Sequence, residues 1–233
     1  MDATLLPART LRRLAAWLAA GALAIAALGQ CTDIDLALAD AVFDAGVFPW
    51  RHAWLTEAVG HGMLKWLLVL LALGFIVAAG ADLLAPSARR CAADRLRLRV
   101  VALSAILVPA AVNALKHVSS SHCPWDLQRY GGVQPYLRLF DAVPAGAMPG
   151  QCLPAGHASS ALWLVSLAVY WLPGRPATAG RMACLALVPG LALGWLQQLR
   201  GAHFMTHTLW SAWIACALVS VLVAALQAPL RAG

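Results

Sequence analysis

Residues 151–160, Gln-Cys-Leu-Pro-Ala-Gly-His-Ala-Ser-Ser, decide how the rest of this chain can be organised. A turn with Pro154 and Gly156 presents His157 and then leads directly into a long apolar segment. This order is typical of a helix that begins at a membrane boundary with an ionisable group in its first turn. Such a helix start offers unsatisfied backbone N–H groups and a positive dipole end, which together suit a phosphate.

The composition indicates an integral membrane protein with a single domain, residues 1–233. Hydrophobic residues make up 61% of the chain and charged residues 12%, whereas a soluble domain is roughly half apolar and a quarter charged. Six apolar stretches each approach the ~20 residues that a spanning helix needs. They are residues 11–28, 64–85, 99–118, 157–172, 182–199 and 208–226. We therefore predict an all-α polytopic membrane protein, a bundle of six transmembrane helices.

The basic residues predict the orientation of this bundle. Eleven of the 17 Lys and Arg residues fall on the side that holds both termini, including the arginines of residues 89–99. By the positive-inside rule this side is cytoplasmic, so the net charge of +7 is a topology signal and does not indicate nucleic-acid binding. The predicted location is the inner membrane of a bacterial cell, with the active site facing the periplasm.

Histidines and three of the cysteines gather on the predicted outer side. All seven histidines lie in or beside the outer loops, at positions 52, 61, 117, 122, 157, 203 and 207. Such one-sided clustering favours a catalytic or metal site over scattered surface histidines. Cys123 and Cys152 bracket the longest outer loop, and in an oxidising periplasm they can form a disulfide, although sequence alone does not fix the pairing.

Three segments at helix ends carry groups that suit a phosphate. They are residues 116–126, 154–157 and 200–207. Lys116 and Arg200 lie within them and Arg129 lies close by, and these three residues are the cationic donors. Lysine and arginine neutralise phosphate oxygens. One histidine can attack phosphorus while a second protonates the leaving oxygen. Such a site needs neither a metal nor another cofactor.

These segments resemble the type 2 phosphatidic acid phosphatase superfamily of membrane lipid phosphatases. The pattern of that family is Lys-x6-Arg-Pro, then Pro-Ser-Gly-His, then Ser-Arg-x5-His-x3-Asp. Lys116 and Pro124 match the first motif in spacing, and His203 matches the third. Pro154, Gly156 and His157 match the second motif. The resemblance implies a six-helix membrane bundle with its site at the outer face.

The chain departs from this pattern at several motif positions, which is typical of a variant branch. Cys123 replaces the arginine of the first motif, and Ala155 replaces the serine of the second. In the third motif, Gln197 replaces the arginine and His207 the aspartate. Arg200 lies near the same helical face as position 197 and is our candidate for the missing guanidinium.

The resemblance also implies roles for individual residues. His203 would form a phospho-histidine, and His157 would be the general acid that later activates water. The phosphate would be held by Lys116, Arg200, Arg129 and the backbone N–H of Gly156. His207, one turn after His203, would orient its ring, and Asp126 is the candidate carboxylate in place of the missing aspartate.

Several alternatives remain open at this stage. A rival alignment makes His207 the nucleophile, with Gly201 and Ser211 at the flanking motif positions. His203 and His207 are spaced to bind zinc, although no glutamate lies between them. The chain could also be a lipid phosphotransferase or a non-catalytic lipid-binding pseudoenzyme. The candidate substrates are undecaprenyl pyrophosphate, phosphatidylglycerol phosphate, phosphatidic acid and the phosphates of lipid A.

Overall fold

The computed structural model describes residues 4–54, 56, 64–146 and 148–227, and most of these residues are helical, with no strand among them. His61 of the histidine cluster lies outside these ranges. The α-helices are α1 (Ala8–Cys31), α2 (Ile34–Asp40), α3 (Leu64–Leu84), α4 (Ala92–His117), α5 (Gly156–Leu162), α6 (Pro176–Leu199) and α7 (Met205–Gln227). Three 3₁₀ segments join them: η2 (Pro124–Asp126), η3 (Gln128–Tyr130) and η4 (Trp163–Trp171).

Five of these helices are long and apolar enough to cross a membrane. They are α1, α3, α4, α6 and α7, which are 21 to 26 residues long and of high hydropathy. Each residue of an α-helix adds about 1.5 Å, so ~20 residues cover a hydrocarbon core of ~30 Å. Pro109 lies inside α4 and Pro189 inside α6. Neighbouring helices can satisfy the backbone groups that such prolines free.

The stretch predicted at residues 157–172 forms a composite element in place of one regular helix. Seven residues of α5 continue directly into nine residues of η4. Because a 3₁₀ helix rises about 2.0 Å per residue, α5 and η4 together extend for roughly 28 Å. Serine hydroxyls donate to carbonyls three residues earlier, from Ser159 to Gly156 and from Ser166 to Trp163. A count of six spans stays a prediction that depends on this element.

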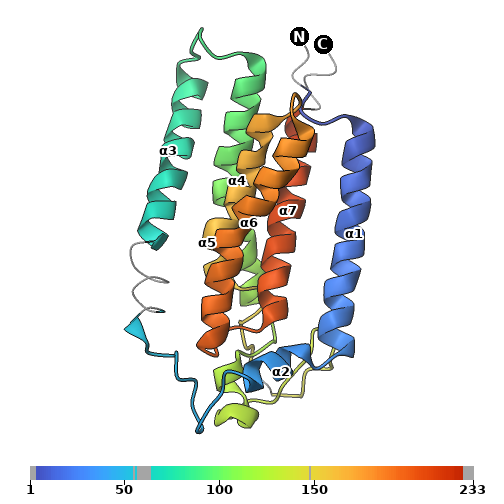
Figure 1. The fold of residues 1–233 in the computed structure, drawn as a ribbon, viewed down its shortest axis with the longest axis vertical. Coiled ribbons are helices and arrows are strands. Elements are labelled where there is room, and N and C mark those ends of the chain that lie inside the picture. Colours follow the sequence, from blue (N-terminus) through green and yellow to red (C-terminus); the bar gives the residue numbers. More distant parts are fainter. Residues whose placement is uncertain (1–3, 55, 57–63, 147, 228–233) are drawn as a thin grey trace.

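The α5–η4 element lies in the middle of the bundle, between α4, α6 and α7 (Figure 1). Leu162 and Trp163 are almost completely buried there and belong to the main hydrophobic core. Glycines on α6 allow its close approach, because a Cβ at Gly190 would lie 2.5 Å from the Leu162 side chain. A Cβ at Gly194 would likewise lie 2.2 Å from Thr208 on α7. Small residues at such helix crossings are typical of membrane bundles.

The two ends of the bundle differ in construction. At one end the start of α1 is tied to the end of α7, because the buried Gln227 side-chain amide bonds the backbone of Leu5 and Leu6. At the opposite end, α2 and the 3₁₀ segments η2 and η3 form a cap (Figure 1). Phe43, Phe48 and Tyr130 pack there with ring centroids 5.0 to 5.3 Å apart.

Candidate functional site

Three segments that are distant in sequence meet at the capped end of the bundle. They follow α4, precede α5 and join α6 to α7. Backbone hydrogen bonds connect them: Cys152 N–H to the Ser121 carbonyl at 3.0 Å, Trp125 N–H to Gly201 at 3.0 Å, and Ala155 N–H to His207 at 3.1 Å. Backbone hydrogen bonds therefore hold the three motif-bearing segments together.

The structure brings three of the predicted histidines into one row. The ring centroids of His157 and His203 are 6.0 Å apart, and those of His203 and His207 are 5.9 Å apart, both in edge-to-face geometry. His203 is exposed by only 2%, while His157 is half-buried. His203 thus occupies the middle of the row. His157, which is more exposed, lies on one side of it and His207 on the other.

The environment of His203 favours its neutral form. Burial holds the pKa of His203 well below its usual range, and the nearby charges of His207, His157 and Lys116 lower it further. The Cys152 backbone opposes this shift by hydrogen-bonding the imidazole. A neutral imidazole has a nitrogen lone pair, which is what a nucleophile requires.

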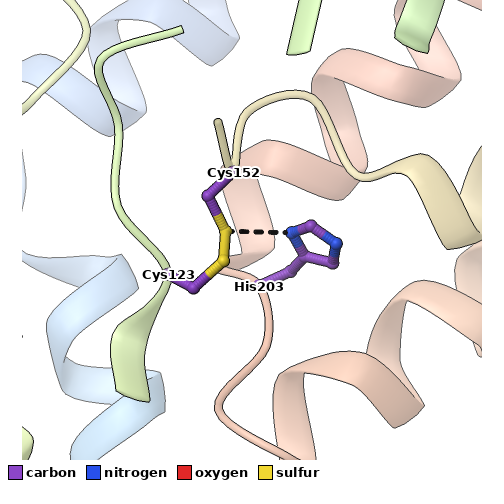
Figure 2. A group of neighbouring side chains, drawn as sticks. All are labelled: Cys123, Cys152 and His203. Atoms are coloured by element: carbon purple, nitrogen blue, oxygen red, sulfur yellow. Dashed lines mark hydrogen bonds between the residues drawn. A yellow bond between two sulfur atoms is a disulfide. The ribbon is translucent and has the colours of Figure 1, made fainter. Parts of the chain in front are cut away.

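A disulfide lies directly against the His203 ring. Cys123 and Cys152 are joined, and the Cys152 Sγ atom is 3.4 Å from Nδ1 of His203 (Figure 2). The ligand atoms of these three residues lie within 4.8 Å of one another, a spacing that a metal ion would also fit. A disulfide sulfur is not the thiolate that binds zinc. The disulfide-bonded pair is therefore better suited to pack against His203 than to bind a metal ion.

A cavity of about 410 Å³ opens beside His157, between α3, α4 and α5. Its polar part includes Lys116, Gly156 and Ser160, and its apolar part includes Leu68 and Trp163. A Cβ added at Gly156 would meet no atom within 4 Å, so this glycine leaves open space at the cavity wall. The cavity thus combines a cationic, histidine-bearing region with an apolar one.

Arg200 lies close to the position where the family pattern has its arginine. It is exposed by only 8%, and its Nη1 donates to the Gln197 side-chain oxygen at 3.3 Å. Its Nε donates to the backbone carbonyl of Arg51 at 3.1 Å. Gly201 follows with a left-handed φ of 71°, and a Cβ there would lie 2.4 Å from the Phe48 ring. The turn that leads to His203 therefore requires glycine.

The structure gives Arg129 and Asp126 different surroundings from those of the histidine row. The Arg129 guanidinium forms two hydrogen bonds with the Asp40 carboxylate, at 2.8 and 2.6 Å, at an exposed position on the cap. These bonds hold the pKa of Asp40 below its usual range. The backbone carbonyl of Asp126 accepts the N–H groups of Val133 and Gln134. Neither Arg129 nor Asp126 is among the residues that line the main cavity.

One supporting contact was missed by sequence reasoning. Asp35 on α2 is buried, and its carboxylate accepts both the backbone N–H and the hydroxyl of Thr206 at the start of α7. This carboxylate therefore anchors the helix end that carries His207. An acidic residue among apolar neighbours at 34–40 was the available signal. Its partner, 171 residues away, could not be read from the sequence.

The fold and site define an all-helical protein of membrane-spanning character, with a histidine row and a lysine at one end of its bundle. The family model described as the PAP2 superfamily matches residues 97–231, more than half of the chain. The chain therefore belongs to the PAP2 superfamily, a family of phosphatases. No curated protein and no solved structure matches the chain significantly.

Proposed function

We propose that this chain hydrolyses a phosphate monoester or pyrophosphate of a membrane lipid, without a metal ion, through a phospho-histidine. The observation that carries the proposal is the shared location of Lys116 and His157 in one cavity, with His157 6.0 Å from His203 between ring centroids. The apolar part of the same cavity suits a lipid chain next to a phosphate head group. Membership of the PAP2 superfamily supports the reaction class.

The proposed reaction has two steps. A lone pair on His203 attacks phosphorus and the bond from phosphorus to the lipid oxygen breaks, while protonated His157 gives its proton to that oxygen. His157, now neutral, then takes a proton from water as the water oxygen attacks phosphorus, and the bond from phosphorus to His203 breaks. Inorganic phosphate leaves and His157 is protonated again.

The phosphate charge is balanced in this scheme by Lys116 and Arg200, with the backbone N–H of Gly156 as a further donor. His203 is almost fully buried and its ring contacts that of His157, so in this scheme the phosphorus reaches His203 from the side of His157. His207 lies in the first turn of α7, four residues after His203, with its ring 5.9 Å away, and its proposed role is to help orient that ring. Arg129 and Asp126 stay sequence-based candidates, because their observed contacts are with the cap.

The proposed orientation places the site at the periplasmic face of a bacterial inner membrane. Arg9, Arg12 and Arg13 begin α1, and Arg89 and Arg90 precede α4, all at the end opposite the cap. The positive-inside rule makes that end cytoplasmic. With α5 and η4 counted as one crossing, the chain makes six passes.

A phosphate-release assay against a lipid panel tests this function. Purified protein in detergent would be mixed with phosphatidic acid, phosphatidylglycerol phosphate, undecaprenyl pyrophosphate and lipid A, with excess EDTA throughout. We expect phosphate release from at least one lipid, unchanged by EDTA. Activity that EDTA abolishes would indicate a metal enzyme instead. Transfer that requires an acceptor lipid would indicate a phosphotransferase, and binding without turnover would indicate a pseudoenzyme.

A further inference from the structure

The Cys123–Cys152 disulfide occupies a key position in the site that the proposed mechanism leaves unused. Cys123 stands where the family pattern has an arginine, and Cys152 is completely buried two residues before Pro154. The bridge joins the segment after α4 to the segment before α5, across 29 residues. Parallel to it, Gln151 N–H donates to the Ser119 carbonyl at 2.9 Å. Backbone bonds therefore already hold these segments together beside the bridge.

The disulfide offers His203 only acceptor groups. A disulfide sulfur has lone pairs and no hydrogen, so the Nδ1 atom 3.4 Å from Cys152 Sγ can interact with it favourably only as an N–H donor. The Cys152 backbone, which stabilises the protonated ring, is an acceptor too. Figure 2 shows the second ring nitrogen pointing away from the disulfide. With the hydrogen on Nδ1, this second nitrogen, Nε2, carries the lone pair.

We propose that the Cys123–Cys152 disulfide is a positioning element that keeps the His203 hydrogen on Nδ1, so that reduction of the bridge lowers the activity of the site. This inference rests on the proposed function, because it requires Nε2 of His203 to be the nucleophile. A ring nitrogen that carries hydrogen has no lone pair with which to attack phosphorus. A carboxylate often fixes the tautomer of a catalytic histidine; here a sulfur does so, while the His207 ring packs against the His203 ring.

Reduction reverses this arrangement. A dithiol or phosphine reductant gives two electrons to the bridge, the S–S bond breaks, and each sulfur takes up one proton while the reductant is oxidised. The Cys152 thiol is then a donor next to Nδ1. It favours the tautomer with a lone pair on Nδ1 and the hydrogen on Nε2. The two sulfurs also move apart once they are no longer bonded, which displaces the surface against which the ring packs.

Two cysteine variants separate this role from that of a simple cross-link. Cys123→Ala leaves a thiol at position 152 beside His203, whereas Cys123→Ala with Cys152→Ala leaves no sulfur, and both lack the bridge equally. In the presence of a phosphine reductant, we expect the single variant to have a kcat about tenfold below that of the double variant, because a partner that selects the wrong tautomer costs more than no partner. Both should melt at the same temperature. Equal kcat values would overturn the proposal and leave the bridge as a cross-link only.

The exposed thiols of Cys31, Cys91 and Cys184 provide the matched control. A variant with alanine at these three positions should respond to the reductant as the unmodified chain does, with kcat falling by roughly tenfold to a hundredfold. Insensitivity of that variant, beside a sensitive unmodified chain, would assign the effect to other thiols and contradict the proposal.

Nitrogen-15 NMR of histidine-labelled protein tests the inference without any need for activity. The His203 signals, identified from their loss in His203→Gln, should show hydrogen on Nδ1 in the oxidised protein and on Nε2 after reduction. If the tautomer changes but no lipid is hydrolysed, the proposed function fails while the positioning role stands. If lipid is hydrolysed but the tautomer is the same in both states, the positioning role is wrong and the proposed function stands.

Discussion

The sequence predicted two arginines that bind phosphate, Arg200 near the histidine row and Arg129 on the cap. In the structure the first is buried and the second is exposed. Arg200 is exposed by only 8%, and its Nε and Nη1 atoms donate to the Arg51 backbone carbonyl and the Gln197 side-chain oxygen. Arg129 is exposed, and its guanidinium already has a carboxylate partner in Asp40. Little water screens the charge of a buried guanidinium, so it interacts strongly with an anion, whereas an exposed one is screened and must first give up its carboxylate partner. Motif spacing does not reveal this difference.

The largest expected effect is the loss of the central histidine of the row. His203→Gln should lower phosphate release by roughly a thousandfold or more, because the covalent step has no other nucleophile. His117→Gln is the matched control, since His117 is exposed at the end of α4 and should keep activity. Retention of activity in His203→Gln together with its loss in His207→Gln would favour the rival alignment, in which His207 is the nucleophile.

The second largest expected effect is a difference in kcat/KM between substitutions of the two arginines. Arg200→Gln should lower kcat/KM by about a hundredfold, because a buried cationic donor to the transferring phosphoryl group is lost. Arg129→Gln should change kcat/KM by less than about threefold, since exposed ion pairs contribute little. Both would be measured with the lipid that gives the highest release. Equal losses would break the comparison, and would mean that the phosphate draws Arg129 away from Asp40.

The sequence predicted the parts of this arrangement that depend on order and hydropathy. The apolar stretches gave five span-like helices, and motifs at helix ends gave the segments that meet at the cap, because ends of adjacent antiparallel helices share one side. The composite α5–η4 element was not predicted, because hydropathy does not distinguish an α-helix from a 3₁₀ helix. The partners of Arg129 and Thr206 were also hidden, because Asp40 and Asp35 lie 89 and 171 residues away.

Gly156 lines the cavity and Gly190 packs against Leu162, so alanine substitutions at these two positions should have different effects. Gly156→Ala should keep the stability of the protein, because its Cβ meets nothing within 4 Å, but should lower kcat/KM by about tenfold as the methyl group fills the space for the phosphate. Gly190→Ala should lower stability by ~1–3 kcal/mol, because its Cβ overlaps Leu162 and overpacks the core. Thermal melting and phosphate release would be measured for both. Full activity in Gly156→Ala would remove Gly156 from the phosphate site.

The smallest expected effect is a difference in the pH range over which the two regions lose stability. The pKa of His203 is lowered by burial, so its contribution to stability is complete above the unfolded pKa of about 6.5 and is lost as pH falls below it, by at most ~1.4 kcal/mol per pH unit. The pKa of Asp40 is lowered by Arg129, so that contribution is lost only below an unfolded pKa of about 3.9. Melting temperatures at pH 7.5 and 5.5 would separate the two. The decrease should be smaller in His203→Gln than in the unmodified protein, because glutamine takes up no proton, and unchanged in Asp40→Asn. An equal decrease in His203→Gln would show that groups other than His203 titrate in this range.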